Sequence, residues 1–315
     1  MRVGLIQAGS GERPAIDILS YRKYRCADHS GLDAILADFA SHTAPAEDCV
    51  IATAGYAMDD GTVISANLPW PLSAENIRTR LGFRNVHLVN DFEAVAHAAA
   101  HIDDSQVLQL TGPSHATRGP MLVIGPGTGL GAAVWIPLDH GSVVLATEAG
   151  QASLAATTEL EMAVLQQMLR SRPHVSIEQA LSGPGLLNLY NALCAIREVV
   201  PVHLTPDAVS AAACDGSDPL AIETLQLFCG ILGSTIGDMA LLYGVQGGVY
   251  LAGGILPKIS QFLLNSSFVE RFLNKGAMGK ALQSIPVKLV EHGQLGVIGA
   301  ASWYLESRPR KPSAA

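Results

Sequence analysis

A two-domain α/β fold is the architecture that this sequence predicts, on three observations. Segments rich in β-branched residues alternate with segments of helical spacing from Arg2 to about Leu305. The 315 residues and the 49% share of hydrophobic residues suffice for two buried cores. A turn with three glycines begins at Gly127 between two β-rich runs, and such a turn lets a ligand approach the backbone closely.

The first hundred residues are expected to hold short strands and three helices. Residues 49–54 form an apolar, β-branched run suited to a buried strand, and Ser73 caps a helix. Residues 86–89 form a strand that runs into Asn90, Asp91 and an alanine-rich helix, so a carboxylate lies where strand turns into helix. We expect strands at 2–7, 15–24, 49–54, 61–66 and 86–89, and helices at 29–39, 73–81 and 92–100.

Beyond residue 101 the chain is expected to be mainly helical around a sheet. Two β-rich runs flank the turn at Gly127, and Gly247–Gly254 forms a strand that ends in a glycine pair. Because strands alternate with helices, mostly parallel sheets are expected. We expect helices at 158–169, 177–197, 218–242, from about 257 and at 296–305, and a last strand at 286–290.

Composition argues against several classes of protein. The net charge of −8 and the pI near 5.6 disfavour nucleic acid or an anionic membrane as the main partner. The five cysteines are widely spaced, odd in number and without a C-x-x-C pair, which disfavours a disulfide framework and a zinc site. With no uninterrupted apolar run of about 18 residues and no signal-peptide pattern, we expect a cytoplasmic protein.

The turn at Gly127 is a candidate phosphate site. Phosphate oxygens can approach Gly127, Thr128 and Gly129 closely enough to accept bonds from successive backbone N–H groups. No Lys-Ser/Thr pair follows, which excludes a Walker A loop. The spacing to Ala132 fits a dinucleotide loop, but residues 132–136 have the composition of a strand rather than a helix. A strand, glycine turn, strand arrangement is how actin-like sugar kinases hold ATP phosphates, and an ordinary hairpin is the alternative.

Seven blocks of the sequence, in this order, resemble the bacterial glucokinase family. They are Asn67–Trp70, Val89–Ala94, Gly125–Gly131, Glu148–Gln151, Glu178–Tyr190, Phe228–Gly233 and Gly247–Pro257. The resemblance implies an actin-like (ribonuclease H-like) two-domain sugar kinase fold that closes a cleft around sugar and ATP. We accordingly expect a smaller domain of residues 1–101 plus 292–308, a larger one of 102–291, and a tail of 309–315.

The expected reaction is ATP-dependent phosphorylation of glucose to glucose 6-phosphate, with Mg²⁺. Such a transfer needs a carboxylate to accept the hydroxyl proton, and Asp91 is the candidate base. The helix dipole and free N–H groups there favour the ionised form of Asp91, although the residue could also merely cap the helix. The resemblance assigns the sugar to Asn67, Asn90, Glu148, Gln151 and Glu178, and the nucleotide to Gly127, Thr128, Gly129, Gly253 and Gly254. No residue is assigned as a metal ligand, and a homodimer is possible.

Two departures from the family pattern bear on this expectation. The family has Glu-x-Gly-His where this chain ends in Gln151, and an amide cannot be protonated as an imidazole can, so the choice of hexose is open. The family also begins with Asp-x-Gly-Gly-Thr before the segment that corresponds to Met1–Leu5. A longer natural chain and a truncated kinase-like protein both fit this start. The alternatives are a catalytically impaired, glucokinase-like sugar-binding or regulatory protein and, far behind, a nucleotide-dependent oxidoreductase.

Overall fold

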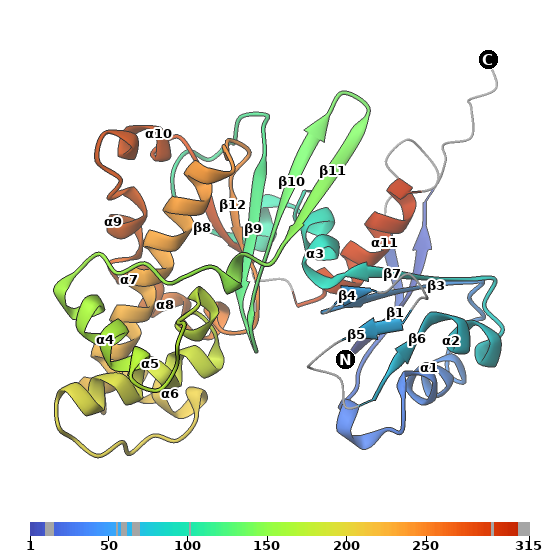
Figure 1. Cartoon of the computed structure of the whole chain (residues 1–315). Coiled ribbons are helices and arrows are strands. Elements are labelled where there is room, and N and C mark those ends of the chain that lie inside the picture. Colours follow the sequence, from blue (N-terminus) through green and yellow to red (C-terminus); the bar gives the residue numbers. More distant parts are fainter. Residues whose placement is uncertain are drawn as a thin grey trace. The chain divides into compact units, whose positions relative to one another are not determined.

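The computed structural model describes residues 1–9, 16–54, 56–57, 62–64, 70–100, 102–290 and 293–307. The chain divides into two compact units, one of Met1–Ile102 with His292–Ala315 and one of Asp103–Glu291 (Figure 1). We call them unit 1 and unit 2 and describe each by itself.

Unit 1 combines short sheets with four helices in its described part. Strands β1 and β2 pair antiparallel, β3 and β7 pair parallel, and β4, β5 and β6 form a small antiparallel sheet. The strands are β1 (Arg2–Ala8), β2 (Ile16–Lys23), β3 (Asp48–Thr53), β4 (Tyr56–Ala57), β5 (Thr62–Ile64), β6 (Leu72–Ser73) and β7 (Asn85–Asn90). The helices are α1 (Leu32–Ala40), α2 (Ala74–Leu81), α3 (Asp91–Ala99) and α11 (Leu295–Ser307).

Helices α3 and α11 pack at very short range in unit 1. A Cβ on Gly299 of α11 would overlap the carbonyl oxygen of Ala94 in α3, so the glycine permits the approach. Four residues further along α11, Trp303 Nε1 donates to Glu93 Oε1 at 2.9 Å. These two contacts fix the first turn of α3, which begins at Asp91.

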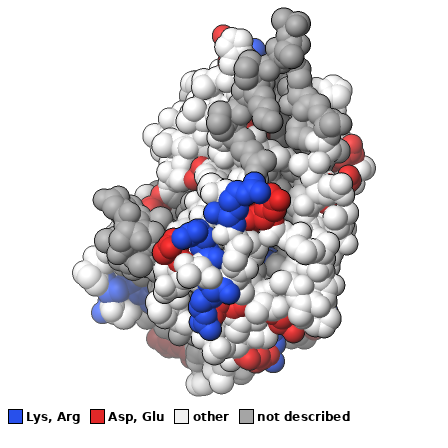
Figure 2. All heavy atoms as spheres, turned by 90° about the vertical axis from the view of Figure 1, so that its right-hand side faces the viewer, with Lys and Arg blue, Asp and Glu red and all other residues white. Residues whose placement is uncertain are grey.

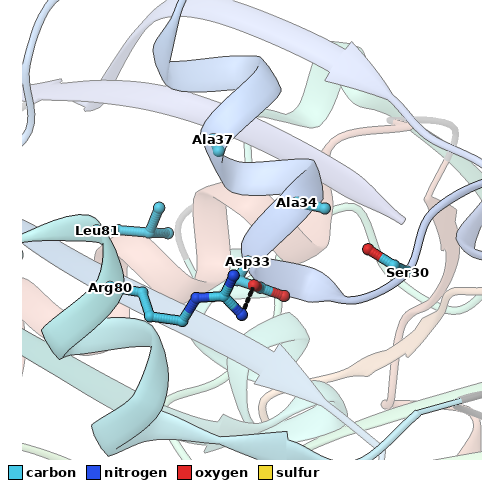
Figure 3. Close-up of a pocket in the computed structure, with 6 residues that line it drawn as sticks. All are labelled: Ser30, Asp33, Ala34, Ala37, Arg80 and Leu81. Carbon is cyan, nitrogen blue, oxygen red and sulfur yellow. Dashed lines mark ion pairs between the residues drawn. The ribbon is translucent and has the colours of Figure 1, made fainter.

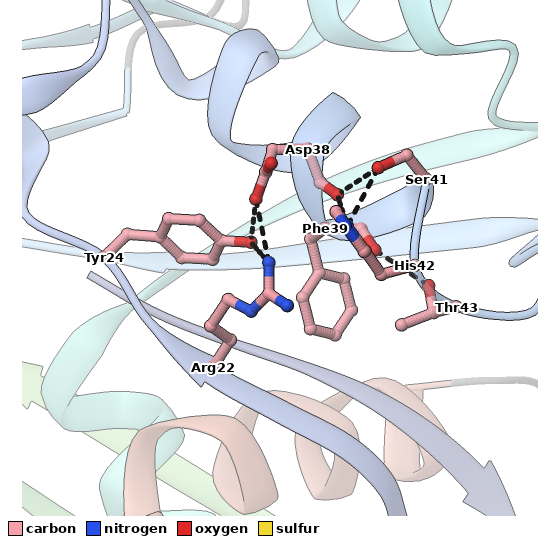
Figure 4. A network of polar contacts seen from close by, with 7 residues as sticks. All are labelled: Arg22, Tyr24, Asp38, Phe39, Ser41, His42 and Thr43. Carbon is pink, nitrogen blue, oxygen red and sulfur yellow. Dashed lines mark hydrogen bonds and ion pairs between the residues drawn. The ribbon is translucent and has the colours of Figure 1, made fainter.

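A polar network connects the end of β2 with α1 (Figure 4). Tyr24 Oη donates to Asp38 Oδ2 at 2.7 Å, and Arg22 Nη1 lies 3.1 Å from the same oxygen. The bond from Tyr24 lowers the pKa of the Asp38 carboxyl, and burial raises the pKa of Tyr24. Because Arg22 and Asp38 are both well exposed, we interpret the network as a modest structural link.

Charged side chains on one face of the molecule adjoin charges of opposite sign (Figure 2). In unit 1, Arg78 pairs with Glu75 at 2.7 Å and Arg84 pairs with Glu47 at 2.9 Å. Arginines that are neutralised locally make a poor surface for a phosphate backbone.

Unit 2 is built on a six-stranded sheet with the order β11-β10-β9-β12-β13-β8. The strands are β8 (Val107–Thr111), β9 (Met121–Pro126), β10 (Leu130–Leu138), β11 (Gly141–Thr147), β12 (Val249–Leu251) and β13 (Val287–Val290). The helices are α4 (Glu159–Leu169), α5 (Gly183–Ile196), α6 (Pro206–Asp215), α7 (Pro219–Leu242), α8 (Ser260–Leu264), α9 (Phe268–Leu273) and α10 (Gly279–Leu282). Alternate residues of β9 and β12, such as Leu122 and Leu251, are fully buried in one cluster with residues of α5 and α7.

Helix α7 is apolar over most of its length. Its 24 residues are long and apolar enough to cross a membrane, yet 78% of the apolar window is buried inside the protein. Burial of this extent identifies α7 as a core helix of unit 2. Glu223, Gln226 and Asp238 interrupt its apolar residues, so α7 agrees with the expectation that no uninterrupted apolar run of about 18 residues occurs.

The expectation of mostly parallel sheets is wrong. Pairs β3–β7, β12–β13 and β9–β12 are parallel, but β9, β10 and β11 form an antiparallel meander and β8 joins the sheet antiparallel to β13. The meander arises because short turns, rather than helical crossovers, connect its strands. The expected strand at 61–66 is described only at its centre, Thr62–Ile64.

The expected helix at 177–197 is two elements. A 3-10 helix covers Ile177–Gln179, and α5 starts at Gly183, because Ser182 caps it and Pro184 occupies its first turn. Strands β8 and β11 and helix α6 were absent from the expectation. Thr205 caps α6 and Pro206 opens it, a helix-start signal that was readable in the sequence.

Candidate active site

The predicted base Asp91 is the first residue of helix α3. Strand β7 ends at Asn90. Asn90 Oδ1 accepts from the backbone N–H of Phe92 at 2.9 Å and of Glu93 at 3.1 Å. The capping role that the sequence left open for Asp91 therefore belongs to Asn90. Asp91 Oδ1 also accepts from the Phe92 N–H at 2.9 Å, which orients the carboxylate.

The pKa of Asp91 is shifted in the direction opposite to the sequence-based expectation. Burial raises the pKa of the half-buried Asp91 carboxyl above its usual value, and hydrogen bonds from the backbone N–H groups of Phe92 and Asp91 offset only part of this effect. Desolvation therefore outweighs the helix terminus, which was expected to favour the charged form. A carboxylate with a higher pKa is a better proton acceptor, provided that it is ionised when it acts.

Of the two asparagines assigned to the sugar, the structure describes Asn90 and not Asn67. Asn90 uses its Oδ1 for the cap, which leaves the Nδ2 group as its donor toward a ligand. Asn67 lies outside the residues that the structure describes. Trp70, close to Asn67 in sequence, donates from Nε1 to the carbonyl of His29 at 3.3 Å and packs against the core of unit 1.

In unit 2, the glycine turn joins two antiparallel strands. Strand β9 ends at Pro126 and β10 begins at Leu130, so residues 127–129 form the loop of a hairpin and no helix follows. The Gly127 N–H donates to the Gly129 carbonyl at 2.7 Å. In the described part of the chain, the N–H groups of Thr128 and Gly129 have no such partner. Two backbone donors of this loop, rather than the three expected, are therefore available to a ligand.

Glu178 connects the turn with the segment that carries Gln151. Its Oε2 accepts from the Leu130 N–H at 2.8 Å, and its Oε1 accepts from Gln151 Nε2 at 3.2 Å. A Cβ on Gly129 would overlap Glu178 Oε2, so the carboxylate lies directly against the loop. The predicted sugar acceptor is therefore also a structural partner of the glycine turn.

Glu148 directly precedes a short 3-10 helix, Ala149–Gln151, of which Gln151 is the last residue. The Gln151 side chain is exposed. His174 Nε2 lies 3.2 Å from the Gln151 carbonyl oxygen. His174 was not predicted from the sequence, because nothing in its local pattern connects it with a residue 23 positions earlier.

The glycine pair after β12, Gly253 and Gly254, borders the glycine turn of residues 127–129. Gly253 has φ +97°, and a Cβ there would lie 2.5 Å from the Pro126 carbonyl oxygen, so only glycine fits this approach. Around Gly254 the space is open, with nothing within 4 Å of an added Cβ. Unit 2 thus brings the expected nucleotide residues together.

The N-terminus of helix α5 completes this group, and the sequence had not indicated that it lies beside the turn. The Gly183 N–H donates to the Gly127 carbonyl at 2.8 Å, and Ser182 Oγ accepts from the Gly185 N–H at 2.9 Å. The positive end of the α5 dipole therefore lies beside the glycine turn, an arrangement that favours anions.

No group of three or more His, Cys, Asp or Glu side chains suited to a metal ion occurs among the described residues. A cavity of about 470 Å³ lies in unit 1 between α1 and α2 and is lined by Ser30, Asp33, Ala34, Ala37, Arg80 and Leu81 (Figure 3). It contains the Arg80–Asp33 ion pair and none of the predicted site residues. We therefore do not assign the active site to this cavity.

Comparison with known proteins extends over nearly the whole chain. The family model described as Glucokinase matches residues 2–307. A glucokinase-like protein of Xylella fastidiosa (strain 9a5c) is 55% identical over 308 residues, covering 98% of this chain and 92% of that protein.

Solved structures agree with this match. The crystal structure of a glucokinase from an Antarctic psychrotroph aligns with a TM-score of 0.84 and 36% identity, over 97% of this chain and 95% of the other. A glucokinase of the ROK family from Streptomyces griseus, solved with glucose and AMPPNP, aligns with a TM-score of 0.61 and 23% identity over 91% and 92% of the chains, which shows the fold alone. The predicted actin-like sugar kinase fold is confirmed. With the sequence blocks, the fold and a family match from end to end in agreement, this chain belongs to the glucokinase family.

Proposed function

We propose that this protein is a glucokinase, which transfers the γ-phosphoryl group of ATP to the 6-hydroxyl of D-glucose and releases glucose 6-phosphate and ADP. The observation that carries the proposal is the setting of Asp91, a half-buried carboxylate with a raised pKa at the start of α3. Because Asn90 caps the helix, Asp91 is available for chemistry.

In the proposed reaction, the Asp91 carboxylate accepts the proton of the sugar hydroxyl as the oxygen attacks the γ-phosphorus. One O–P bond forms, the bond to ADP breaks, and the proton resides on Asp91 until it exchanges with water. Asn90 donates from Nδ2 to a neighbouring hydroxyl, and Asn67, Glu148, Gln151 and Glu178 hold the remaining hydroxyls. The raised pKa of Asp91 supports the role of base.

We assign the nucleotide to unit 2. The available N–H groups of Thr128 and Gly129 and the α5 terminus suit phosphate, while Gly253 and Gly254 offer bare backbone to the adenosine part. The Streptomyces griseus glucokinase, solved in complex with both glucose and AMPPNP, supports this pair of ligands. Mg²⁺ would neutralise charge on the transferring phosphates. Mg²⁺ commonly uses one or two carboxylates, substrate phosphates and water, which fits the lack of a three-ligand cluster among the described residues.

The second candidate is a glucokinase-like protein that binds hexose with little turnover. Gln151 in place of the family's histidine favours it, since its amide is committed to Glu178. The 55% identical relative in Xylella fastidiosa also carries the name glucokinase-like. Under either function we place the protein in the cytoplasm, in accord with its five free cysteines, and under the first in glycolysis.

One pair of measurements separates the two candidates. Purified protein is titrated with glucose, mannose and fructose by calorimetry, and ADP release is followed with each sugar and MgATP. A kinase shows hexose binding together with hexose-dependent ADP release. Binding of a hexose without ADP release favours the impaired protein, and absence of both contradicts the two proposals.

A further inference from the structure

A charged pair lies beside the elements that the proposed function assigns to the nucleotide. Lys258 Nζ is 2.9 Å from Asp207 Oδ1, and the two side chains are 65% and 82% exposed. Lys258 belongs to the 3-10 helix Leu256–Ile259, which follows Gly253 and Gly254. Asp207 lies in the first turn of α6.

Contacts around Gly183 show how near this pair lies to the phosphate turn. The Gly183 N–H donates to the Gly127 carbonyl. A Cβ on Gly183 would lie 3.9 Å from Pro206 Cγ and 4.0 Å from Ile255 Cδ1. Pro206 directly precedes Asp207, and the Lys258 N–H donates to the Ile255 carbonyl at 3.0 Å. Pro206 and Ile255 therefore lie close to Gly183, and each member of the pair is at most one helical turn from one of them.

A nucleotide phosphate chain carries several negative charges, and the turn itself supplies only neutral N–H donors. Two arginines of unit 2 are held by partners that are less exposed. Arg197 pairs with Glu223 at 2.6 Å, and the mostly buried Arg271 pairs with Glu161 at 2.7 Å. Lys258 differs because it pairs with a highly exposed carboxylate, and exposed pairs of this kind are weak.

We propose that the Lys258 ammonium group leaves Asp207 and binds the phosphate chain of the nucleotide. Asp207 then lowers nucleotide affinity, because it competes with the phosphate chain for the ammonium group. This inference rests on the proposed function. The flexible four-carbon stem of lysine lets the ammonium group move between the two anions without a change in the fold. A phosphate group with two charges is the stronger partner.

The test is calorimetric titration of the full chain with ADP and with adenosine, at low salt and in the presence of glucose. Lys258→Gln is expected to weaken ADP binding about fivefold and to leave adenosine binding unchanged, because adenosine carries no phosphate. Asp207→Asn is expected to tighten ADP binding about two- to fivefold, and Lys258→Arg to retain most of it. Lys280→Gln, at an exposed lysine of α10, is the matched control and should bind ADP like the wild type.

Two failures can be told apart. Wild-type protein that binds neither ADP nor ATP contradicts the proposed function and this inference together. Wild-type protein that binds ADP with an affinity that Lys258→Gln leaves unchanged, or that Asp207→Asn weakens, overturns the inference alone. An equal loss of ADP and adenosine binding in Lys258→Gln would also overturn it, because Lys258 would then shape the pocket rather than contact phosphate.

Discussion

Gln151 Nε2 donates a hydrogen bond to Glu178 Oε1 at 3.2 Å, while the other oxygen of the same carboxylate accepts from the Leu130 N–H at the end of the glycine turn. One side chain thus links a residue proposed to hold sugar with the loop proposed to hold phosphate. A glutamate committed in this way has a defined orientation, which an exposed glutamate on a surface lacks.

Removing the amide at position 151 should weaken sugar binding. In Gln151→Leu the Glu178 carboxylate loses one donor, and a hydrogen bond to a charged group is worth about 1.5–3 kcal/mol before exposure reduces it. We expect glucose affinity to fall about tenfold with little change in Tm, because Gln151 is exposed. Calorimetry checks this, with Gln167→Leu on α4 as control. Unchanged glucose affinity would show that the amide does not serve the sugar.

Restoring the family's residue tests hexose preference. Gln151→His keeps a donor toward Glu178 and adds an ionisable ring. We expect kcat/KM for glucose to rise about tenfold, the effect of one good hydrogen bond at roughly 1.4 kcal/mol. Steady-state kinetics with glucose, mannose and fructose measure it. The same or poorer kinetics for all three sugars would indicate that the pocket is adapted to glutamine.

Two glycines of the turn should differ sharply when each is changed to alanine. A Cβ on Gly129 would overlap Glu178 Oε2, whereas at Gly127 the nearest atom is the Gly129 carbonyl oxygen at 4.0 Å. We expect Gly129→Ala to raise the KM for ATP at least about tenfold and Gly127→Ala to change it less than about threefold. Kinetics at saturating glucose compare them. Equal effects of the two variants would contradict the assignment of the Gly129 side of the loop to phosphate.

The packing of α11 against α3 can be tested with a matched pair of glycine-to-alanine substitutions. Gly299→Ala forces a methyl group into the Ala94 carbonyl and should destabilise the protein by about 1–3 kcal/mol. Gly296→Ala, on the same helix with nothing within 4 Å, should be neutral or gain up to about 1 kcal/mol of helix propensity. Urea unfolding measures both. A Gly299→Ala variant as stable as Gly296→Ala would mean that the two helices do not approach this closely.

Stability should depend on pH through Asp91 with a definite sign. Because burial raises the pKa of Asp91 in the folded state, the ionised carboxylate destabilises the fold. This cost appears as pH rises through the pKa of Asp91 in the unfolded state and then through its pKa in the folded state. Asp91→Asn should therefore be more stable than the wild type at about pH 7, and the gain should vanish at a pH below about 3, where both states are protonated. Thermal unfolding at both pH values checks the sign. A variant less stable at neutral pH would contradict the raised pKa.

The sequence predicted most elements and missed those whose signals are not local. Ser73 as a cap, the alanine-rich α3 and the β-branched β3 follow from propensity and pattern, and the structure has all three. The antiparallel meander was missed because β11 has no feature that distinguishes its pairing partner. Its edge position, with Val143 and Leu145 exposed, emerges only from the sheet order.

In the candidate site, too, local features could be predicted from the sequence and features that depend on distant contacts could not. Motif blocks pointed to Asp91, Gly129 and Glu178, and each lies at an element boundary or within a short connecting element. The Asn90 cap is a local contact with Phe92 and Glu93 that the sequence analysis did not assign. That desolvation outweighs the helix terminus at Asp91 and that Glu178 contacts the turn depend on burial and on contacts between distant residues. Such contacts have no signature in a single sequence.

Turnover and glucose affinity of Asp91→Ala, measured on the same protein preparation, test the central claim most directly. If Asp91 is the base, kcat falls by about 10²–10⁴-fold while the Kd for glucose stays within about threefold, since only one of several sugar contacts is lost. Asp91→Asn, which keeps the acceptor for the Phe92 N–H, should lose turnover equally. A variant that retains more than about a tenth of wild-type turnover would contradict general-base catalysis by Asp91.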